Sequence, residues 1–208
     1  MNVSSAADLD TTSAVFVART GRFLGAIVIA DAIRPEAKHA IEAFDRMGIR
    51  TILLTGDTEP VARSVAQALG IGAVEASLLP EMKLTRIKSL VASGRVVAMV
   101  GDGINDSPAL SYADVGIAMK HGAEVTHESA NVLLMEDSLW KLVKAIEISR
   151  DAVGLIKQNY GIVSVLNTLA LGLALPGGLI TPELTALISN GSAILASVNG
   201  LRPVLRYQ

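Results

Sequence analysis

The chain has 208 residues, no cysteine and a formal net charge of −2, and half of its residues are hydrophobic while only 18% are charged. A charge this close to zero, without clustered Lys and Arg, excludes a nucleic-acid-binding protein, and the lack of cysteine excludes disulfides and thiolate metal sites. Nearly all the charged residues lie within residues 1–157, so the end of the chain differs in character from the rest.

The first two thirds of the chain alternate short β-branched runs with amphipathic helical patterns. Residues 13–19 and 24–31 predict two strands joined by a turn at Gly21. Further along, we predict strands at 50–57, 95–103, 114–119 and 131–135, and helices at 35–48, 59–70 and 80–94. Continuous apolar strands that alternate with helices indicate an α/β, Rossmann-like domain, in which helices cover both faces of a parallel sheet.

Polar side chains follow two of these strands at the point where each strand ends. Thr55–Asp57 ends the strand pattern predicted at 50–57, and the dense motif GDGINDSPAL begins at the end of the pattern predicted at 95–103. Ligands bind at the carboxyl ends of the strands in such a sheet, so the two clusters predict one site. The side-chain oxygens of Asp102, Asn105 and Asp106 suit Mg²⁺, which takes one or two carboxylates together with waters and phosphate oxygens.

The other residues around this predicted site suit a phosphate group. Thr55 and the backbone N–H of Gly56 can donate hydrogen bonds to phosphate oxygens, and Lys83 can neutralise phosphoryl charge. A metal, a phosphate cradle and a cation are the parts of a phosphoryl-transfer site. Each part also has a structural interpretation, with Lys83 a solvated helix residue and Thr55–Asp57 an ordinary turn and N-cap.

Two uncharged stretches near the end of the chain predict a transmembrane hairpin. Residues 156–175 and 184–201 approach the roughly 20 apolar residues that a membrane-spanning helix needs, and 176–183 predicts the turn. Lys and Arg flank the outer ends and are absent from the turn. The positive-inside bias therefore predicts a multi-pass protein of the cytoplasmic (inner) membrane, with both termini cytoplasmic and lipid as a partner. The alternative is a pair of buried core helices in a larger soluble protein.

Four motifs resemble those of P-type ATPases, within the haloacid dehalogenase superfamily: TGD at 55–57, PEMK at 80–83, GDGINDSPAL at 101–110 and ADVGIAM at 113–119. SRDAVGLIKQN, followed by the uncharged stretches and NGLR, resembles the heavy-metal-transporting branch. The resemblance covers residues 13–205 and implies the carboxyl-terminal third of such a pump. It divides the chain into a nucleotide-binding-domain remnant (1–30), a phosphorylation-type domain (31–150) and the transmembrane hairpin (151–208).

The resemblance also implies roles for single residues. Asp102 and Asp106 are expected to bind Mg²⁺ with the help of Asn105. The remaining site residues are expected to contact the aspartyl phosphate (Thr55, Gly56 and Asp57) or to stabilise it (Lys83). Thr55, Asp57 and Lys83 are thus the candidate catalytic residues.

The DKTGT motif, which carries the phosphorylated aspartate of P-type ATPases, does not occur in the sequence. We therefore expect a fragment or split part of a heavy-metal ATPase that is not competent alone. Its expected partners are an upstream part carrying DKTGT, needed also for ATP, and a heavy-metal cation as cargo. Two alternatives remain open: a membrane-anchored regulatory module that binds Mg²⁺ and phosphate without catalysis, and a capless phosphatase with Asp8 as nucleophile and Asp10 as acid–base.

Five polar side chains lie within or beside the uncharged stretches: Asn167, Ser189, Asn190, Ser192 and Asn199. Polar groups within a membrane suggest the path of a transported ion, or else hydrogen bonds between helices. The motifs of the copper and zinc branches match only in part, so the sequence does not identify the metal.

Overall fold

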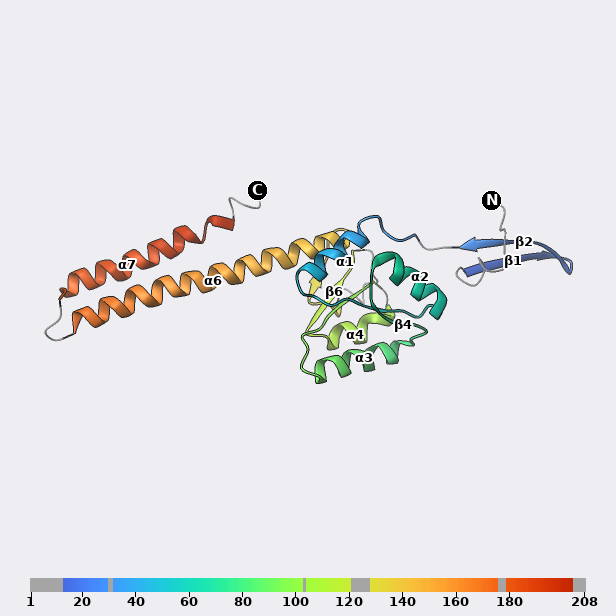
Figure 1. Cartoon of the computed structure of the whole chain (residues 1–208), viewed down its shortest axis with the longest axis horizontal. Helices are drawn as coiled ribbons and strands as arrows, with labels where there is room; N and C mark the ends of the chain where they lie inside the picture. Colours follow the sequence, from blue (N-terminus) through green and yellow to red (C-terminus); the bar gives the residue numbers. More distant parts are fainter. Residues whose placement is uncertain (1–12, 30–31, 103, 121–127, 176–178, 204–208) are drawn as a thin grey trace. The chain divides into compact units, whose positions relative to one another are not determined.

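The computed structural model describes residues 13–29, 32–102, 104–120, 128–175 and 179–203. The chain divides into two compact units, Met1–Val143 and Lys144–Gln208. Among the described residues, the first unit holds the strands and the shorter helices, while the second holds most of one long helix and the whole of another. Figure 1 gives the order of the elements.

The two strands predicted near the start of the chain form an antiparallel hairpin. They are β1 (Ser13–Arg19) and β2 (Arg22–Ile29). The turn uses positive φ at both central residues, 50° at Thr20 and 76° at Gly21. Such turns match the right-handed twist of the paired strands, which is why a glycine is favoured here.

The remaining strands of the first unit are all parallel to their neighbours. β3 (Ile52–Leu54) pairs with β4 (Ala73–Glu75), and β6 (Val115–Ala118) pairs with both β5 (Ala98–Gly101) and β7 (Val132–Leu133). The predicted parallel sheet is confirmed, but as two pieces: across the described ranges no backbone ladder joins β3 to β5. Strand β4 was not predicted, because three residues carry too little periodicity to recognise.

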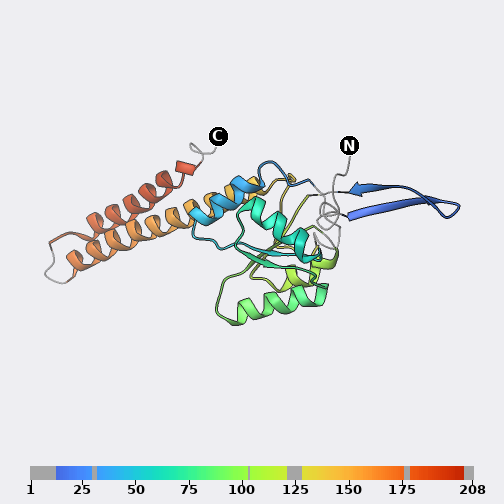
Figure 2. The same cartoon turned by 45° about the vertical axis from the view of Figure 1, so that its right-hand side comes forward.

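Helices cover both faces of these strands, as predicted. Figure 2 shows α1 (Ala37–Arg46) and α2 (Glu59–Leu69) on one side of the strands, and α3 (Pro80–Ala92) and α4 (Ser107–Tyr112) on the other. Residues of α3, α4 and β5 share one apolar cluster, in which Ala109 and Leu110 are fully buried. Leu54 of β3 packs against the same cluster, so both pieces of the sheet rest on one core.

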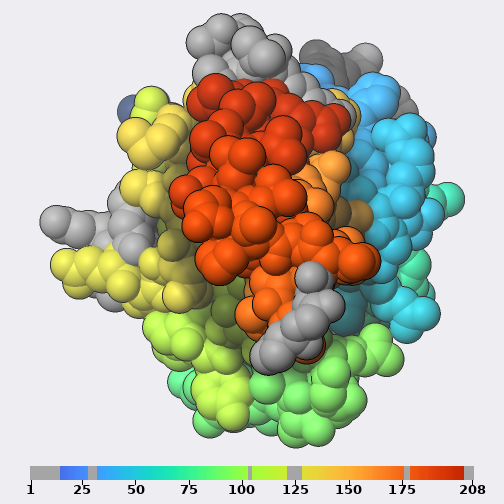
Figure 3. Space-filling model, turned by 90° about the vertical axis from the view of Figure 1, so that its left-hand side faces the viewer, coloured from blue at the N-terminus to red at the C-terminus, as the bar shows by residue number. Residues whose placement is uncertain are grey.

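The second unit pairs most of α6 (Leu139–Ala174) with α7 (Pro182–Asn199). Near one end the Asn199 amide donates to Asn159 Oδ1 at 2.7 Å, and farther along the Ser192 hydroxyl lies 3.4 Å from Asn167 Oδ1. Going from Ser192 to Asn199 along α7, the partner in α6 moves back from Asn167 to Asn159, so the two helices are antiparallel. In Figure 3 the side chains of α7 (red) lie next to those of α6 (orange).

The predicted transmembrane hairpin is wrong. In the described part of the chain, no helix is both long enough and apolar enough to cross a membrane. Residues 156–175 and 184–201 are largely helical, but the prediction counted missing charges and not polarity. Several amides, Asn167 and Asn190 among them, interrupt the apolar residues. The inner-membrane location, the topology with two cytoplasmic termini and the expected lipid contact rested on that hairpin and are withdrawn.

Helix α7 begins with a polar cap that lowers the pKa of a carboxyl group. The Thr181 hydroxyl accepts the backbone N–H of Leu184 at 3.4 Å. Its hydrogen bond to the Glu183 side chain, and then the backbone N–H of Glu183, hold the pKa of this carboxyl below its usual value. Because the folded-state pKa is lowered, the stabilisation is present above the unfolded pKa and is lost as pH falls through the folded pKa.

We expect Thr181→Ala to raise the pKa of Glu183 toward its usual value, since the main hydrogen bond to the charged carboxylate is removed. An NMR titration of the side-chain carboxyl carbon measures this shift. Thr185→Ala is the matched control, because the Thr185 hydroxyl donates to the Thr181 carbonyl and not to Glu183. An unchanged pKa in Thr181→Ala would contradict the assignment.

Candidate phosphoryl-transfer site

The loop after β3 forms a closed polar turn. The Thr55 hydroxyl donates to Asp57 Oδ2 at 2.7 Å and accepts the backbone N–H of Asp57 at 3.1 Å. The loop is held to the segment after β4, where the backbone N–H of Ser77 donates to the Asp57 carbonyl at 2.7 Å. The N-cap of α2 is Thr58, without a side-chain cap, so Asp57 does not cap that helix.

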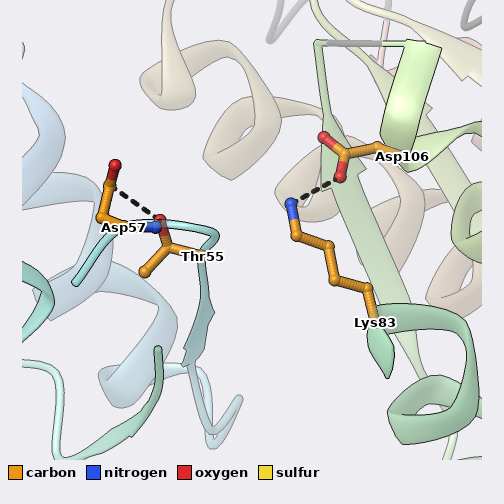
Figure 4. Close-up of polar contacts among 4 residues, drawn as sticks. All are labelled: Thr55, Asp57, Lys83 and Asp106. Carbon is orange, nitrogen blue, oxygen red and sulfur yellow. Dashed lines mark hydrogen bonds and ion pairs between the residues drawn. The ribbon is translucent and has the colours of Figure 1, made fainter. Parts of the chain in front are cut away.

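The loop after β5 carries a partly buried ion pair. Lys83 Nζ, from the first turn of α3, lies 2.8 Å from Asp106 Oδ1, and the two side chains are only 15% and 13% exposed. Asp106 closes a single 3₁₀ turn, Ile104–Asp106, directly before α4. Figure 4 shows the Lys83 side chain extended toward the Asp106 carboxylate. The interpretation of Lys83 as a solvated helix residue is therefore wrong.

A glycine provides the space for the Asp106 side chain. A Cβ atom at Gly101, the last residue of β5, would lie 2.7 Å from Asp106 Cβ and 2.9 Å from Asp106 Oδ2. Any side chain at this position would push the carboxylate away. Gly101 thus explains in steric terms why the motif begins with glycine.

The polar residues of the GDGINDSPAL motif differ in their exposure and in their contacts. It brings Asp106 and Lys83 together, although they are 23 positions apart, whereas Asp102 and Asn105 are exposed. Sequence reasoning did not single out Ser107, whose hydroxyl is buried and has no hydrogen-bond partner among the described residues. Its position directly after Asp106 is the one signal that could have drawn attention to it.

The carboxylate and amide oxygens of this loop suit Mg²⁺, which keeps several water ligands. They do not suit a metal ion whose ligands all come from the protein. Among the described residues, no group of three or more His, Cys, Asp or Glu side chains could hold an ion. Mg²⁺ needs only one or two carboxylates, because it keeps several waters and shares phosphate oxygens. A partly buried carboxylate at Asp106 and an exposed one at Asp102 meet that requirement.

Most of the polar residues predicted as an ion path take part in local hydrogen bonds. The buried Ser192 hydroxyl donates to the Ser189 carbonyl at 2.7 Å and faces Asn167, while Asn199 bonds to α6. Asn190 is exposed. These contacts favour hydrogen bonds between and within helices, and the ion path stays a prediction. The Asp8 and Asp10 of the phosphatase hypothesis lie outside the described residues.

Comparisons with known proteins show the family of this chain. Residues 2–114 match the model of the haloacid dehalogenase-like hydrolase family. The chain is 43% identical over 196 residues to the zinc-transporting ATPase of Bacillus subtilis, covering 90% of this chain and 29% of that protein. It is 41% identical over 200 residues to the silver exporting P-type ATPase of Salmonella typhimurium, covering 93% and 24%.

Solved structures of ATPases are also similar to this chain. A zinc-transporting PIB-type ATPase in its E2.Pi state superposes with a TM-score of 0.84 at 35% identity, over 94% of this chain and 32% of that one. The catalytic CPx-ATPase domain CopB-B superposes with a TM-score of 0.54 at 32% identity, over 61% and 51%. This chain therefore spans less than a third of the length of the curated ATPases that it matches.

Proposed function

Because this chain belongs to the haloacid dehalogenase-like hydrolases, with strong similarity to heavy-metal P-type ATPases, we propose that it supplies the Mg²⁺-binding half of a phosphoryl-transfer site in an ATP-driven transporter of heavy-metal cations. The observation that carries the proposal is the partly buried Lys83–Asp106 pair at the carboxyl end of β5. A pair of opposite charges that is largely removed from water at a ligand-binding edge loses hydration, which is a cost that a structural role alone need not carry.

In this proposal each residue has a defined task. Asp106 and Asp102 hold Mg²⁺, which when bound neutralises the charge of phosphoryl oxygens. The Lys83 ammonium pairs with the same phosphoryl group as a compact point charge. From the β3 side, the Thr55 hydroxyl would turn its one proton from Asp57 to a phosphate oxygen, and the Gly56 N–H would donate to another. The exposed Asn105 amide adds a polar contact.

The nucleophile is proposed to come from a polypeptide segment that carries DKTGT, a motif which this sequence lacks. Within the described residues, β3 pairs only with β4, and β5 only with β6, so one edge of each strand remains for a further parallel strand. A strand that paired with both edges would bring the residue at its carboxyl end near Thr55 and Asp106. Its aspartate carboxylate would attack the γ-phosphorus of ATP, and ADP would leave.

A chimera tests this proposal. In the Bacillus subtilis zinc-transporting ATPase, the segment similar to this chain is replaced by this chain. We expect the chimera to incorporate radiolabelled phosphate from the γ position of ATP into a hydroxylamine-sensitive acyl phosphate. Lys83→Met should remove the label, whereas Lys88→Met should retain it, because Lys88 lies over the Tyr112 ring and outside the site.

Two results would contradict the catalytic role. One is a chimera that folds and is unlabelled while the parent ATPase is labelled. The other is unchanged labelling in Lys83→Met. If the unlabelled chimera still bound Mg²⁺ at Asp106, the result would support the alternative of a regulatory module that binds Mg²⁺ and phosphate without catalysis.

A further inference from the structure

We propose that Lys83 is a resident counter-cation of Asp106, which the carboxylate must release before it can bind Mg²⁺, so that Mg²⁺ and phosphate bind cooperatively. The inference rests on the proposed function, because it takes Asp106 as a Mg²⁺ ligand. It adds a second role to Lys83, that of a residue which keeps divalent-cation affinity low until phosphate is present.

The first step of the argument concerns the space around the carboxylate. Asp106 Oδ1 is 2.8 Å from the Lys83 ammonium, while Oδ2 lies on the side of Gly101, 2.9 Å from the position that a Cβ atom there would take. A divalent cation at Oδ1 would therefore stand beside a positive charge. Two like charges a few ångströms apart in a poorly solvated site repel strongly, so Asp106 cannot keep both partners at Oδ1.

The second step concerns what holds the pair together. Both side chains are less than a sixth exposed, so neither charge can turn to solvent at low cost. Separating them without replacement would leave a buried carboxylate and a buried ammonium unpaired. Release of Lys83 thus requires a new cation for Asp106 and a new anion for Lys83 at the same time.

The third step identifies that anion. Phosphate held by Thr55 and by Gly56 would give the Lys83 ammonium its replacement partner, and the long aliphatic stem of lysine allows the change of partner. Each ligand then removes part of the cost of binding the other. By thermodynamic reciprocity, phosphate must raise the affinity for Mg²⁺ by the same factor as Mg²⁺ raises the affinity for phosphate.

The other cations of α3 do not provide this coupling. Arg86 Nε lies 2.6 Å from Glu75 Oε1, and Lys88 lies over the Tyr112 ring with its Nζ 5.2 Å from the centroid. Among the described residues, the salt bridge of Asp106 is with Lys83. Lys88 is therefore a matched control, since its substitution removes the same charge from the same helix.

The test is calorimetric titration of the full chain with Mg²⁺, with and without inorganic phosphate. We expect Lys83→Gln to bind Mg²⁺ about tenfold more tightly than the wild type in the absence of phosphate, because a competing charge at a few ångströms is gone. Phosphate should tighten Mg²⁺ binding in the wild type and leave Lys83→Gln unchanged. Lys83→Arg, which keeps a cation, and Lys88→Gln should both retain the weak wild-type affinity.

A second measurement covers the case in which Lys83→Gln does not fold. In the wild-type chain, an NMR correlation of the lysine side-chain ammonium groups should show a slowly exchanging Lys83 signal, assigned by its absence in Lys83→Arg. This signal should disappear or shift when Mg²⁺ and phosphate are added together. An unchanged Lys83 signal at saturating Mg²⁺ and phosphate would overturn the exchange of partners.

Different results would refute the coupling between Mg²⁺ and phosphate and the proposed Mg²⁺ site. If Asp106→Asn abolishes Mg²⁺ binding but Lys83→Gln binds Mg²⁺ no more tightly than the wild type, the resident-cation role is refuted and the metal site stands. If Asp106→Asn leaves Mg²⁺ binding unchanged, Asp106 is no Mg²⁺ ligand, and the metal site in the proposed function and the coupling are both refuted.

Discussion

Replacing Asp106 with asparagine should weaken Mg²⁺ binding by about a hundredfold or more, since changes to groups that only support a metal ligand already cost about 10–100-fold. Asparagine keeps the size of the side chain and one oxygen, so it fits the space beside Gly101. It removes the negative charge, however, and leaves the mostly buried Lys83 ammonium without its ion pair. Calorimetric titration of the full chain measures the change.

The matched control is Glu42→Gln, which removes one exposed carboxylate from α1, away from the motif. Its Mg²⁺ affinity should equal that of the wild type. We expect the double variant Asp102→Asn with Asp106→Asn to lose binding completely. Unchanged binding in the double variant would place the metal elsewhere on the chain.

Leu110→Ala should destabilise the first unit by about 2–5 kcal/mol, the usual range for a fully buried leucine. Leu110 is 0% exposed and lies within the apolar cluster that α3, α4 and β5 share. The site around it cannot collapse easily, because α4 packs closely on β6: a Cβ at Gly116 would come within 2.6 Å of the Leu110 carbonyl oxygen. Urea unfolding, followed by a signal from the first unit, gives the change in free energy.

Leu79→Ala is the control for this experiment, because the Leu79 side chain is 62% exposed at the start of α3. Substitution of an exposed side chain is expected to change the free energy of unfolding by less than about 0.5 kcal/mol. A loss below about 1 kcal/mol in Leu110→Ala would show that the cavity is filled by rearrangement and that the cluster is not close-packed.

Much of the first unit could be predicted from the sequence, because its elements carry strong local signals. The hairpin at Ser13–Arg19 and Arg22–Ile29 follows from two β-branched runs around Gly21, and Gly70 correctly marks the end of α2 with a φ of 77°. The three-residue β4 and the six-residue α4 were not predicted. Elements this short are stabilised by their neighbours and not by their own periodicity.

The wrong prediction of a transmembrane hairpin has a different origin. The sequence pattern shows correctly that two uncharged helical stretches end the chain, yet a membrane span requires sustained apolarity and not merely the lack of charge. Asn167 and Asn199 are polar groups that bond across the α6–α7 pair. An interhelical amide contact depends on the register between two helices, which no single-helix hydropathy pattern reports.

The sequence by itself determined where the candidate site is expected, because GDGINDSPAL and Thr55–Asp57 follow apolar runs, and the carboxyl ends of parallel strands meet at one edge of a sheet. Only the tertiary structure decided which of these polar residues meet. Thr55 pairs with Asp57 inside its own loop, whereas Asp106 pairs with Lys83 across 23 residues. The physical reason is packing: α3 and α4 rest on a common core, which brings Lys83 and Asp106 within 2.8 Å, and local spacing contains no information about that contact.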